Sequence, residues 1–364
     1  MSELTNEDVH WLDAAARTAT PWLGSTAETP TVGALVVDEV RQVVLGRGVT
    51  SRGGRPHAEP QALQQAGGKA RGRTLYVTLE PCNHWDKTPP CADAVIRAGI
   101  RRVVVGVNDP DPRTAGEGVA RMLQAGIDVV VAGHKGSARL HEGFLSRHIR
   151  GRPFVTAKLA VSIDGKIGVT DQARYPITGV VAQRWAHMQR AMSDVVMVGG
   201  RTATIDDPRL TVRLPGLEDR LYMRVILMGT SPINPRIELI SGVSPYGTMI
   251  IAAEGVEFKV PPQVEVVNVP GRNGRPDLGA ALTALGSRGF GRLFIEPGAR
   301  LTEALLGGDL VDRFHILTGA ATVGPKGIPA TILGGIEGRV RAAGLSEVDR
   351  QSLGDDKLTT FERL

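Results

Sequence analysis

The chain has 364 residues, of which 42% are hydrophobic and 22% are charged, proportions typical of globular proteins. Its 43 basic and 38 acidic residues give a net charge of +5 that is spread along the chain, which argues against a nucleic-acid partner and leaves room for a small anionic substrate. Two cysteines exclude a disulfide framework, and because the start is polar and no apolar run is long, we expect neither a secretory signal nor a membrane-spanning helix.

Residues 1–150 alternate between helical and strand patterns, which predicts an α/β sandwich with helices on both faces of one sheet. Val9 and Leu12 are spaced as on one helix face, and Gly67-Gly68 marks a helix end. We predict helices over 6–19, 57–66, 91–98, 118–125 and 139–150. We predict strands over 32–37, 43–46, 74–79, 103–107 and 129–132, the first two paired as a hairpin.

Residues 151–364 are expected to form a second α/β domain, because single cores seldom exceed roughly 250–300 residues and Gly151-Arg152-Pro153 breaks the chain. Thr178 is the expected N-cap of the first long helix in this domain. Helices are predicted over 180–192, 277–286 and 301–306. Strands are predicted over 154–160, 195–198, 222–228, 248–253, 264–268, 292–296 and 312–318.

Three potential zinc ligands and one acid lie in the stretch 57–91. His57, Cys82 and Cys91 supply the three protein ligands of a catalytic zinc site, and Glu59 remains as an acid that need not bind the metal. Zinc-dependent deaminases have the pattern His-x-Glu followed by Pro-Cys-x-x-Cys. This chain matches the first half but has eight residues between its cysteines. Two core cysteines and an unrelated histidine would be the alternative, but each ligand falls at the end of a predicted element.

Zinc in such a site would lower the pKa of a bound water, and Glu59 would carry a proton from that water to a ring nitrogen and the leaving ammonia. Between the cysteines, His84 and Lys87 could meet a phosphate or a polar ring group. An exposed loop with incidental charge is the alternative for these two residues.

The second domain contains a strand that runs through Glu296 to Gly298 and into a helix. Backbone amides at such a helix N-terminus can bind a phosphate. Without a Gly-x-Gly-x-x-Gly motif, an ordinary strand–helix turn stays equally open. Lys158, Arg190 and Arg213 are cations that could bind phosphate or lie as solvated surface charges.

Over nearly its whole length the sequence resembles the bifunctional riboflavin-biosynthesis deaminase–reductase family. In the first half, the motifs that carry the resemblance are HAEPQAL from His57, TLEPCNHWDKTPPC from Thr78 and NDPDP from Asn108. In the second half they are RPFVTAKLAVSIDG from Arg152, ITG from Ile177, DDPRLTVR from Asp206, EPG from Glu296 and LTEALL from Leu301. The long loop ending in TPPC distinguishes this family from nucleic-acid and cytidine deaminases.

The resemblance implies a cytidine-deaminase-like α/β/α sandwich followed by a dihydrofolate-reductase-like α/β domain. The domain over 1–150 would be a zinc-dependent pyrimidine deaminase acting on 2,5-diamino-6-ribosylamino-4(3H)-pyrimidinone 5′-phosphate. The domain over 151–364 would reduce the ribosyl group of the product to ribityl with a hydride from NADPH.

The resemblance also implies roles for individual residues, carried over motif by motif. One zinc ion per chain would be bound by His57, Cys82 and Cys91, with Glu59 as the proton shuttle. Substrate contacts would be made by His84, Lys87, Arg190, Leu210, Arg213 and Glu296. NADPH contacts would be made by Ala160, Thr202, Asp206, Gly298, Ala299, Arg300, Leu301, Thr302, Glu303 and Ala304. Lys158 would flank the reductase site without an assigned role.

Five positions depart from the family pattern, at residues that would tune substrate binding: Thr29, Thr50, Asp86, Arg174 and Pro176. They leave open the alternative that the chain is a paralogue in which one active site or both have lost catalytic activity. A nucleobase or RNA deaminase fused to an unrelated nucleotide-binding domain would need a basic groove with aromatics, which make up only 4% of this chain. We therefore expect a small phosphorylated pyrimidine as substrate, no nucleic acid or membrane partner, a homo-oligomer and a cytoplasmic location.

Overall fold

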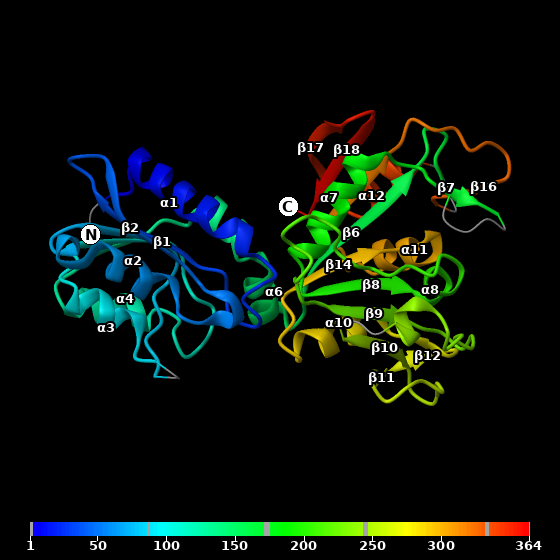
Figure 1. The fold of residues 1–364 in the computed structure, drawn as a ribbon, viewed down its shortest axis with the longest axis horizontal. Helices are drawn as coiled ribbons and strands as arrows, with labels where there is room; N and C mark the ends of the chain where they lie inside the picture. Colours follow the sequence, from blue (N-terminus) through cyan, green and yellow to red (C-terminus); the bar gives the residue numbers. More distant parts are fainter. Residues whose placement is uncertain (1–2, 86–87, 171–174, 243–246, 332–334, 364) are drawn as a thin grey trace. The chain divides into compact units, whose positions relative to one another are not determined.

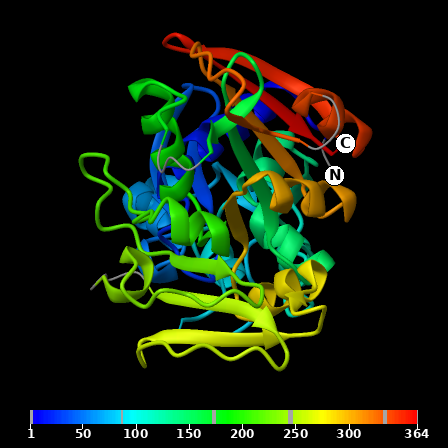
Figure 2. The same cartoon turned by 90° about the vertical axis from the view of Figure 1, so that its right-hand side faces the viewer.

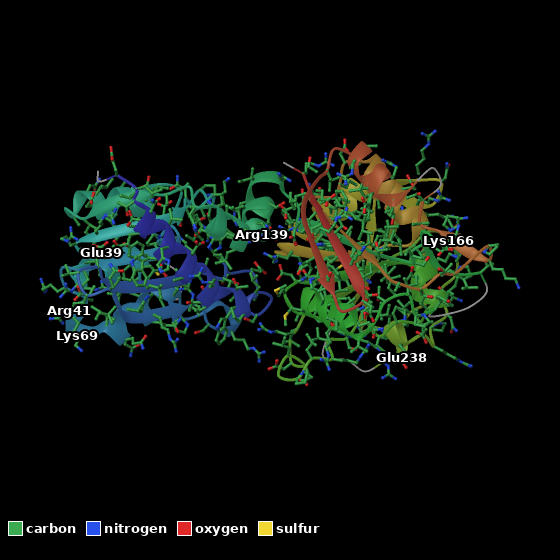
Figure 3. The ribbon with its side chains drawn as sticks, turned by 90° about the horizontal axis from the view of Figure 1, so that it is seen from above. Glu39, Arg41, Lys69, Arg139, Lys166 and Glu238 are labelled. Carbon is green, nitrogen blue, oxygen red and sulfur yellow. The ribbon has the colours of Figure 1, made fainter. Side chains whose placement is uncertain are left out.

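The computed structural model describes residues 3–85, 88–170, 175–242, 247–331 and 335–363. The chain forms two compact units, Met1–Gly151 and Arg152–Leu364, which we call unit 1 and unit 2. Among the described residues, no helix is both long and apolar enough to cross a membrane. Charged side chains of both signs project from the surface, for example Arg41 and Lys69 in unit 1 and Lys166 and Glu238 in unit 2 (Figure 3).

Unit 1 is built on a five-stranded sheet with the strand order β2-β1-β3-β4-β5. Its strands are β1 (Gly33–Asp38), β2 (Val43–Val49), β3 (Thr74–Leu79), β4 (Arg102–Val107) and β5 (Asp128–Val131). The predicted hairpin of β1 and β2 is confirmed. Strand β1 is also antiparallel to β3, whereas β3, β4 and β5 run parallel. The carboxyl ends of these parallel strands therefore share one edge of the sheet, where α/β proteins place their ligands.

Helices cover both faces of this sheet, so the predicted α/β/α sandwich is confirmed (Figure 1). Its helices are α1 (Asn6–Ala19), α2 (Ala58–Ala66), α3 (Cys91–Arg97), α4 (Glu117–Gln124), α5 (Lys135–Leu140) and α6 (Glu142–Arg150), with 3₁₀ turns at Thr20–Trp22, Arg52–Gly54 and Gly67–Ala70. Trp11 and Leu12 of α1 pack on one face, beside Tyr76. Ala62 of α2 and Val95 of α3 pack on the other. Every residue of β3 is buried as a result.

Helix α2, which carries the candidate acid, lies very close to strand β2. A Cβ atom on Gly46 or Gly48 would clash with the backbone carbonyls of Ala62 and Ala58. Only glycine permits this approach of helix to strand. The two glycines therefore fix the depth of α2 and of the residues at its N-terminus.

The predicted helix over 139–150 is confirmed over 142–150, where α6 lies, but the sequence missed a break at His141, which separates α6 from a preceding helix, α5. His141 is buried and has φ −97° and ψ 8°, outside the helical region. Its Nε2 lies 2.9 Å from Thr78 Oγ1 on β3. This contact with the sheet holds the ring inward and explains the break.

Unit 2 contains a nine-stranded sheet with the order β11-β10-β9-β8-β14-β6-β15-β18-β17. Its strands are β6 (Phe154–Val161), β8 (Val195–Gly199), β9 (Met223–Leu227), β10 (Thr248–Ala253), β11 (Val264–Val269), β14 (Arg292–Glu296), β15 (Arg313–Thr318), β17 (Ser346–Leu353) and β18 (Asp356–Glu362). The first seven in this order run parallel, and the hairpin β17–β18 joins antiparallel to β15. The red hairpin and the yellow β11 lie at opposite edges of the sheet (Figure 2).

Buried parallel strands need cover on both faces, and unit 2 has it. The helices are α7 (Val180–Ala191), α8 (Gly200–Ile205), α9 (Glu238–Ser241), α10 (Leu278–Gly286), α11 (Ala299–Gly307) and α12 (Ile336–Ala342). Leu282, Leu305 and Val340 belong to the larger core cluster, while Ala203 and Leu239 belong to the second. Two small ribbons complete the unit, β7 (Lys166–Val169) with β16 (Gly327–Pro329) and β12 (Gly271–Arg272) with β13 (Arg275–Pro276).

The sequence prediction was wrong at several points in unit 2. Gly179, not Thr178, is the N-cap of α7, and no side chain of the cap itself bonds the helix. Instead the Oδ2 of Asp356 accepts the N–H of Gly179 at 2.7 Å, so a distant residue stabilises this helix end. Helices α8, α9 and α12 and the hairpin β17–β18 were not predicted, and α11 begins at Ala299, two residues early.

Candidate active sites

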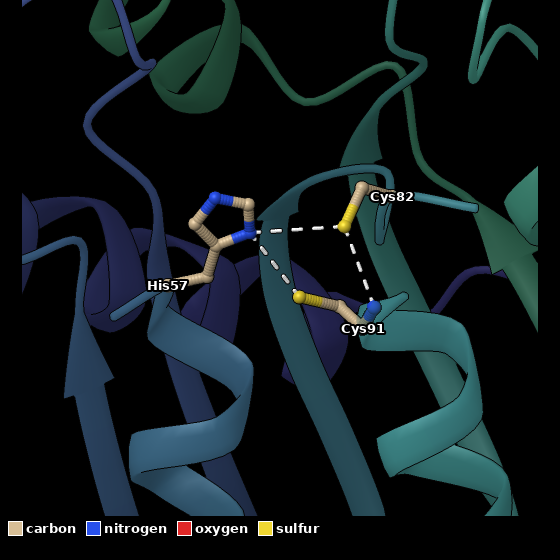
Figure 4. A group of neighbouring side chains, drawn as sticks. All are labelled: His57, Cys82 and Cys91. Carbon is tan, nitrogen blue, oxygen red and sulfur yellow. Dashed lines mark hydrogen bonds between the residues drawn. The ribbon is translucent and has the colours of Figure 1, made fainter. Parts of the chain in front are cut away.

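His57, Cys82 and Cys91 come together at the carboxyl edge of the sheet in unit 1 (Figure 4). His57 precedes α2, Cys82 lies three residues beyond the end of β3, and Cys91 is the first residue of α3. The Nδ1 of His57 is 3.3 Å from the sulfur of Cys91 and 3.7 Å from that of Cys82. All three candidate ligand atoms lie within 4.8 Å of one another. In the described ranges no other group of three His, Cys, Asp or Glu residues does so.

The electrostatics of this cluster suit a divalent cation. The Sγ of Cys82 accepts hydrogen bonds from Cys91, whose backbone N–H lies 3.3 Å away. These bonds and His57 lower the pKa of Cys82 to about 4, against the opposing effect of burial. The pKa of Cys91 is raised by its contact with Cys82 and by burial. Two thiolates side by side repel each other, and zinc relieves that repulsion while favouring one nitrogen and two sulfur ligands.

Glu59 lies in the first turn of α2, two residues after His57, and is only 3% exposed. Its Oε2 is buried without a hydrogen-bond partner among the described residues. Burial raises the pKa of Glu59 to about 7, whereas a nearby cation would lower it. A buried carboxylate oxygen with nothing to bond in the protein is suited to exchange protons with a water or a substrate.

A second buried carboxylate, Glu80, organises the loop beside this cluster. Its oxygens accept the backbone N–H groups of Asp109, Gly116 and Val119 at 3.2, 3.1 and 3.1 Å. The loop so held brings the Oγ1 of Thr114 to 3.1 Å from the Nδ1 of His84. Sequence reasoning missed Glu80 and Thr114. The predicted substrate contact Lys87 and its neighbour Asp86 lie outside the described residues.

The departures from the family pattern have structural roles where they are described. The hydroxyl of Thr50 is buried, accepts the N–H of Val32 and donates to the carbonyl of Pro30, both at 3.0 Å. It therefore fixes the chain where β1 begins. Thr29 is half-buried against Gly54. Pro176 is exposed, and Arg174 lies outside the described residues.

In unit 2, Lys158, Arg190 and Glu296 form one ionic cluster. Glu296 ends β14, its Oε1 lies 2.6 Å from the Nη2 of Arg190, and its Oε2 lies 3.6 Å from the Nζ of Lys158. Burial lowers the pKa of Lys158. Burial alone would raise the pKa of Glu296, but Arg190 and Lys158 together lower it. The cluster therefore holds a carboxylate and two cations with little solvent exposure.

The segment 210–213 lies against this cluster. Arg190 donates to the carbonyl of Thr211 at 3.1 Å, and His187, one helical turn earlier on α7, accepts the backbone N–H of Arg213 at 3.3 Å. Leu210 is buried in a hydrophobic cluster, so any contact it makes with a substrate must come from its backbone. Sequence reasoning missed His187, although its i, i+3 spacing from Arg190 places both on one helix face.

The predicted cofactor residues gather mainly around two helix N-termini. Helix α8 follows β8 and α11 follows β14, and these strands are neighbours in the sheet. A Cβ on Gly298, the N-cap of α11, would lie 3.6 Å from the Oγ1 of Thr202 on α8. Thr302 is buried and its hydroxyl has no partner among the described residues. Clustered helix N-termini and an unsatisfied hydroxyl suit a phosphorylated cofactor.

The other predicted cofactor residues spread further. Asp206 is the C-cap of α8, directly after its last residue, and Ala160 lies two residues beyond Lys158 on the same side of β6. Ala299, Arg300, Leu301 and Ala304 lie along α11. Glu303, on the same helix, pairs through Oε2 with Arg339 of α12 at 2.8 Å, while its buried Oε1 has no hydrogen-bond partner among the described residues.

Comparison with known proteins assigns both halves of the chain. Residues 6–107 match the cytidine and deoxycytidylate deaminase zinc-binding region, and residues 153–353 match the RibD C-terminal domain. The chain is 33% identical to the riboflavin biosynthesis protein RibD of Escherichia coli over 91% of its own length and 92% of that protein. The chain belongs to the RibD family.

Relatives from other bacteria agree over almost the whole chain. RibD of Aquifex aeolicus is 34% identical, with 98% of each chain covered. The solved RibD of Acinetobacter baumannii superposes with a TM-score of 0.85 at 28% identity, over 98% of this chain and 99% of that one. A Thermotoga maritima diaminohydroxyphosphoribosylaminopyrimidine deaminase/5-amino-6-(5-phosphoribosylamino)uracil reductase superposes with a TM-score of 0.81 at 28% identity, over the same shares.

RibD membership confirms the fold and the broad activity that the motifs predicted. Unit 1 has the deaminase zinc-binding region and unit 2 the RibD reductase domain. The chain is therefore a bifunctional deaminase and reductase of riboflavin biosynthesis.

Proposed function

We propose that unit 1 deaminates 2,5-diamino-6-ribosylamino-4(3H)-pyrimidinone 5′-phosphate and that unit 2 reduces the ribosyl group of the product to ribityl with NADPH. The name of the Thermotoga relative describes this pair of activities. The observation that carries the proposal is the buried, unpartnered Oε2 of Glu59 beside the three candidate ligands His57, Cys82 and Cys91.

In the deaminase, His57, Cys82 and Cys91 would hold one zinc ion, which supplies a water of lowered pKa. Glu59 would accept one proton from that water through Oε2 and pass it to the ring nitrogen. It would then pass the proton that remains on the added hydroxyl to the amino group, which leaves as ammonia. Water is consumed and ammonia is released, so the step balances. The Nδ1 of His84 contacts Thr114, which leaves its Nε2 to bind a polar group of the substrate. We propose that Lys87 also contacts the substrate.

In the reductase, NADPH would supply a hydride to C1′ of the ribosyl group, and the ring oxygen takes up a proton as its bond to C1′ breaks. We assign cofactor binding to the N-termini of α8 and α11, with Thr202, Asp206, Ala160 and residues 298–304. Arg190, Arg213, Glu296 and the backbone of Leu210 contact the substrate. Lys158, buried against Glu296 with a lowered pKa, is the residue of this cluster that we propose as the proton donor.

The test is an assay of the purified chain with the diaminopyrimidine ribotide, following ammonia release and NADPH consumption separately. We expect ammonia release without NADPH, and NADPH consumption only after deamination. Deamination of cytidine or of single-stranded nucleic acid, with no turnover of the ribotide, would contradict the proposal. The homo-oligomeric state and the cytoplasmic location stay predictions, and light scattering on the purified protein tests the first.

A further inference from the structure

Helix α7 makes two contacts with the segment 210–213, one through each of two side chains on the same face. The Nη1 of Arg190 donates to the carbonyl of Thr211 at 3.1 Å. The Nδ1 of His187 accepts the N–H of Arg213 at 3.3 Å. The first contact belongs to a residue already placed at the substrate. The second fixes the backbone of Arg213, a proposed substrate contact.

The segment needs such support because the backbone is strained at its first residue, Leu210, and just before it at Asp207. Asp207 has φ +40° and Leu210 has φ +50°, a region that residues with a Cβ rarely adopt. Tyr222 donates its hydroxyl to the carbonyl of Leu210. The N–H of Arg213 lies at the other end of the segment, where His187 is its partner.

His187 is in the protonation state that this contact requires. Only a neutral ring whose proton is on Nε2 can accept at Nδ1. His187 is 8% exposed, and burial, then the neighbouring Arg190 and Arg213, lowers its pKa to about 4. The carbonyl of Thr211 and the carboxylate of Glu296 raise the pKa of His187, but by less than the other effects lower it. The ring is therefore neutral throughout the physiological range.

We propose that His187 is a positioning residue of the reductase, which holds the backbone of Arg213 so that this guanidinium meets the phosphate of the substrate. The role rests on the proposed function, because it needs a phosphorylated substrate at Arg213. Arg213 is an exposed residue, and an exposed arginine gains little from a phosphate unless its backbone is already fixed. His187 therefore governs how strongly the enzyme prefers a phosphorylated substrate over the same compound without phosphate.

The test compares His187→Asn with His187→Leu in the full-length chain. The Oδ1 of asparagine takes nearly the position of Nδ1 and accepts the same N–H, whereas leucine fills the space without an acceptor. For the parent and both variants, kcat and KM are measured for the deaminated ribotide, for its dephosphorylated riboside and for NADPH. Deaminase activity of the same preparations serves as the folding control.

We expect His187→Leu to raise KM for the ribotide about fivefold to tenfold, as the loss of one hydrogen bond to a buried acceptor predicts. Its kcat and its KM for NADPH should stay within about twofold of the parent, as should kcat/KM for the riboside. His187→Asn should restore the ribotide KM to within about twofold.

Other outcomes overturn the inference in distinguishable ways. Equal losses on ribotide and riboside, or a fall in kcat with KM unchanged, would show that His187 serves only the packing of α7. Equal impairment of the asparagine and leucine variants would exclude the acceptor role. Failure of the parent to consume NADPH with the ribotide would refute the proposed function itself, and with it this role.

Discussion

Glu80 offers the sharpest test of how unit 1 is held together, because one carboxylate serves three backbone donors. Glu80 is 3% exposed, and its two oxygens accept N–H groups from Asp109, Gly116 and Val119. Hydrogen bonds to a charged partner contribute roughly 1.5–3 kcal/mol each. Glu80→Ala removes all three, but the backbone at Gly116 lies at an exposed residue where water can replace the bond. We expect a loss of about 4 kcal/mol in the free energy of unfolding.

The assay is urea unfolding followed by circular dichroism. Glu117→Ala provides the matched control, since Glu117 is exposed and lies between two of the bonded residues. It should change stability by less than about 0.5 kcal/mol. Glu80→Gln keeps one acceptor oxygen and should lose about half as much as the alanine variant. A loss below about 1 kcal/mol for Glu80→Ala would refute the reasoning, because the three N–H groups would then find other partners at no cost.

Three further predictions concern the two active sites. Cys82→Ser should reduce zinc from about one ion per chain to well below one by metal analysis, and a native chain without zinc would contradict the ligand assignment. Glu59→Ala should slow ammonia release by at least about a hundredfold. The variant should still bind zinc and oxidise NADPH with the deaminated intermediate. Loss of both activities in a folded, zinc-loaded variant would disprove two separate sites. His187 has an ordinary pKa of 6.5 when unfolded and about 4 when folded, so the stability from its neutral ring is complete well above pH 6.5 and falls by about 3 kcal/mol as the pH drops to 4. Urea unfolding of the parent against His187→Asn across this range should show that difference, and parallel curves would refute it.

The elements that the sequence predicted well have strong local signals. Helix α1 is capped by Thr5 and Asp8, which bond each other's backbone N–H, and its apolar face repeats at helical spacing. Strand β17 was missed because its sequence, SEVDRQSL, is mostly exposed and has no apolar alternation. It forms only because β18 pairs with it. The break at His141 was missed for a similar reason, since the contact that explains it joins residues 63 positions apart.

The residues of the two sites differ in the same way: some are marked by a local sequence motif, and others only by contacts with distant residues. The sequence could assign His57, Cys82 and Cys91 because zinc restricts the ligand types and the motif fixes their spacing. No comparable constraint marks Thr114 or His187. Their partners lie 30 and 26 residues away, and a threonine in a loop or a histidine on a helix is common. Residues that act by orienting other residues became visible only when the folded chain brought them together.

The two units also show why one local sequence does not fix a role. Each site follows a Glu-Pro pair at the end of a strand: Glu80-Pro81 comes directly after β3 and leads to Cys82, and Glu296, the last residue of β14, is followed by Pro297 and Gly298. The hydrogen bonds of Glu80 within the described residues come from backbone N–H groups, so its carboxylate serves to hold a loop. Glu296 meets the side-chain cations of Arg190 and Lys158, which we propose can exchange part of that contact for a charged substrate. The same two residues at the same edge of a sheet are therefore structural in one unit and available for binding in the other, and the partners that the fold supplies decide which.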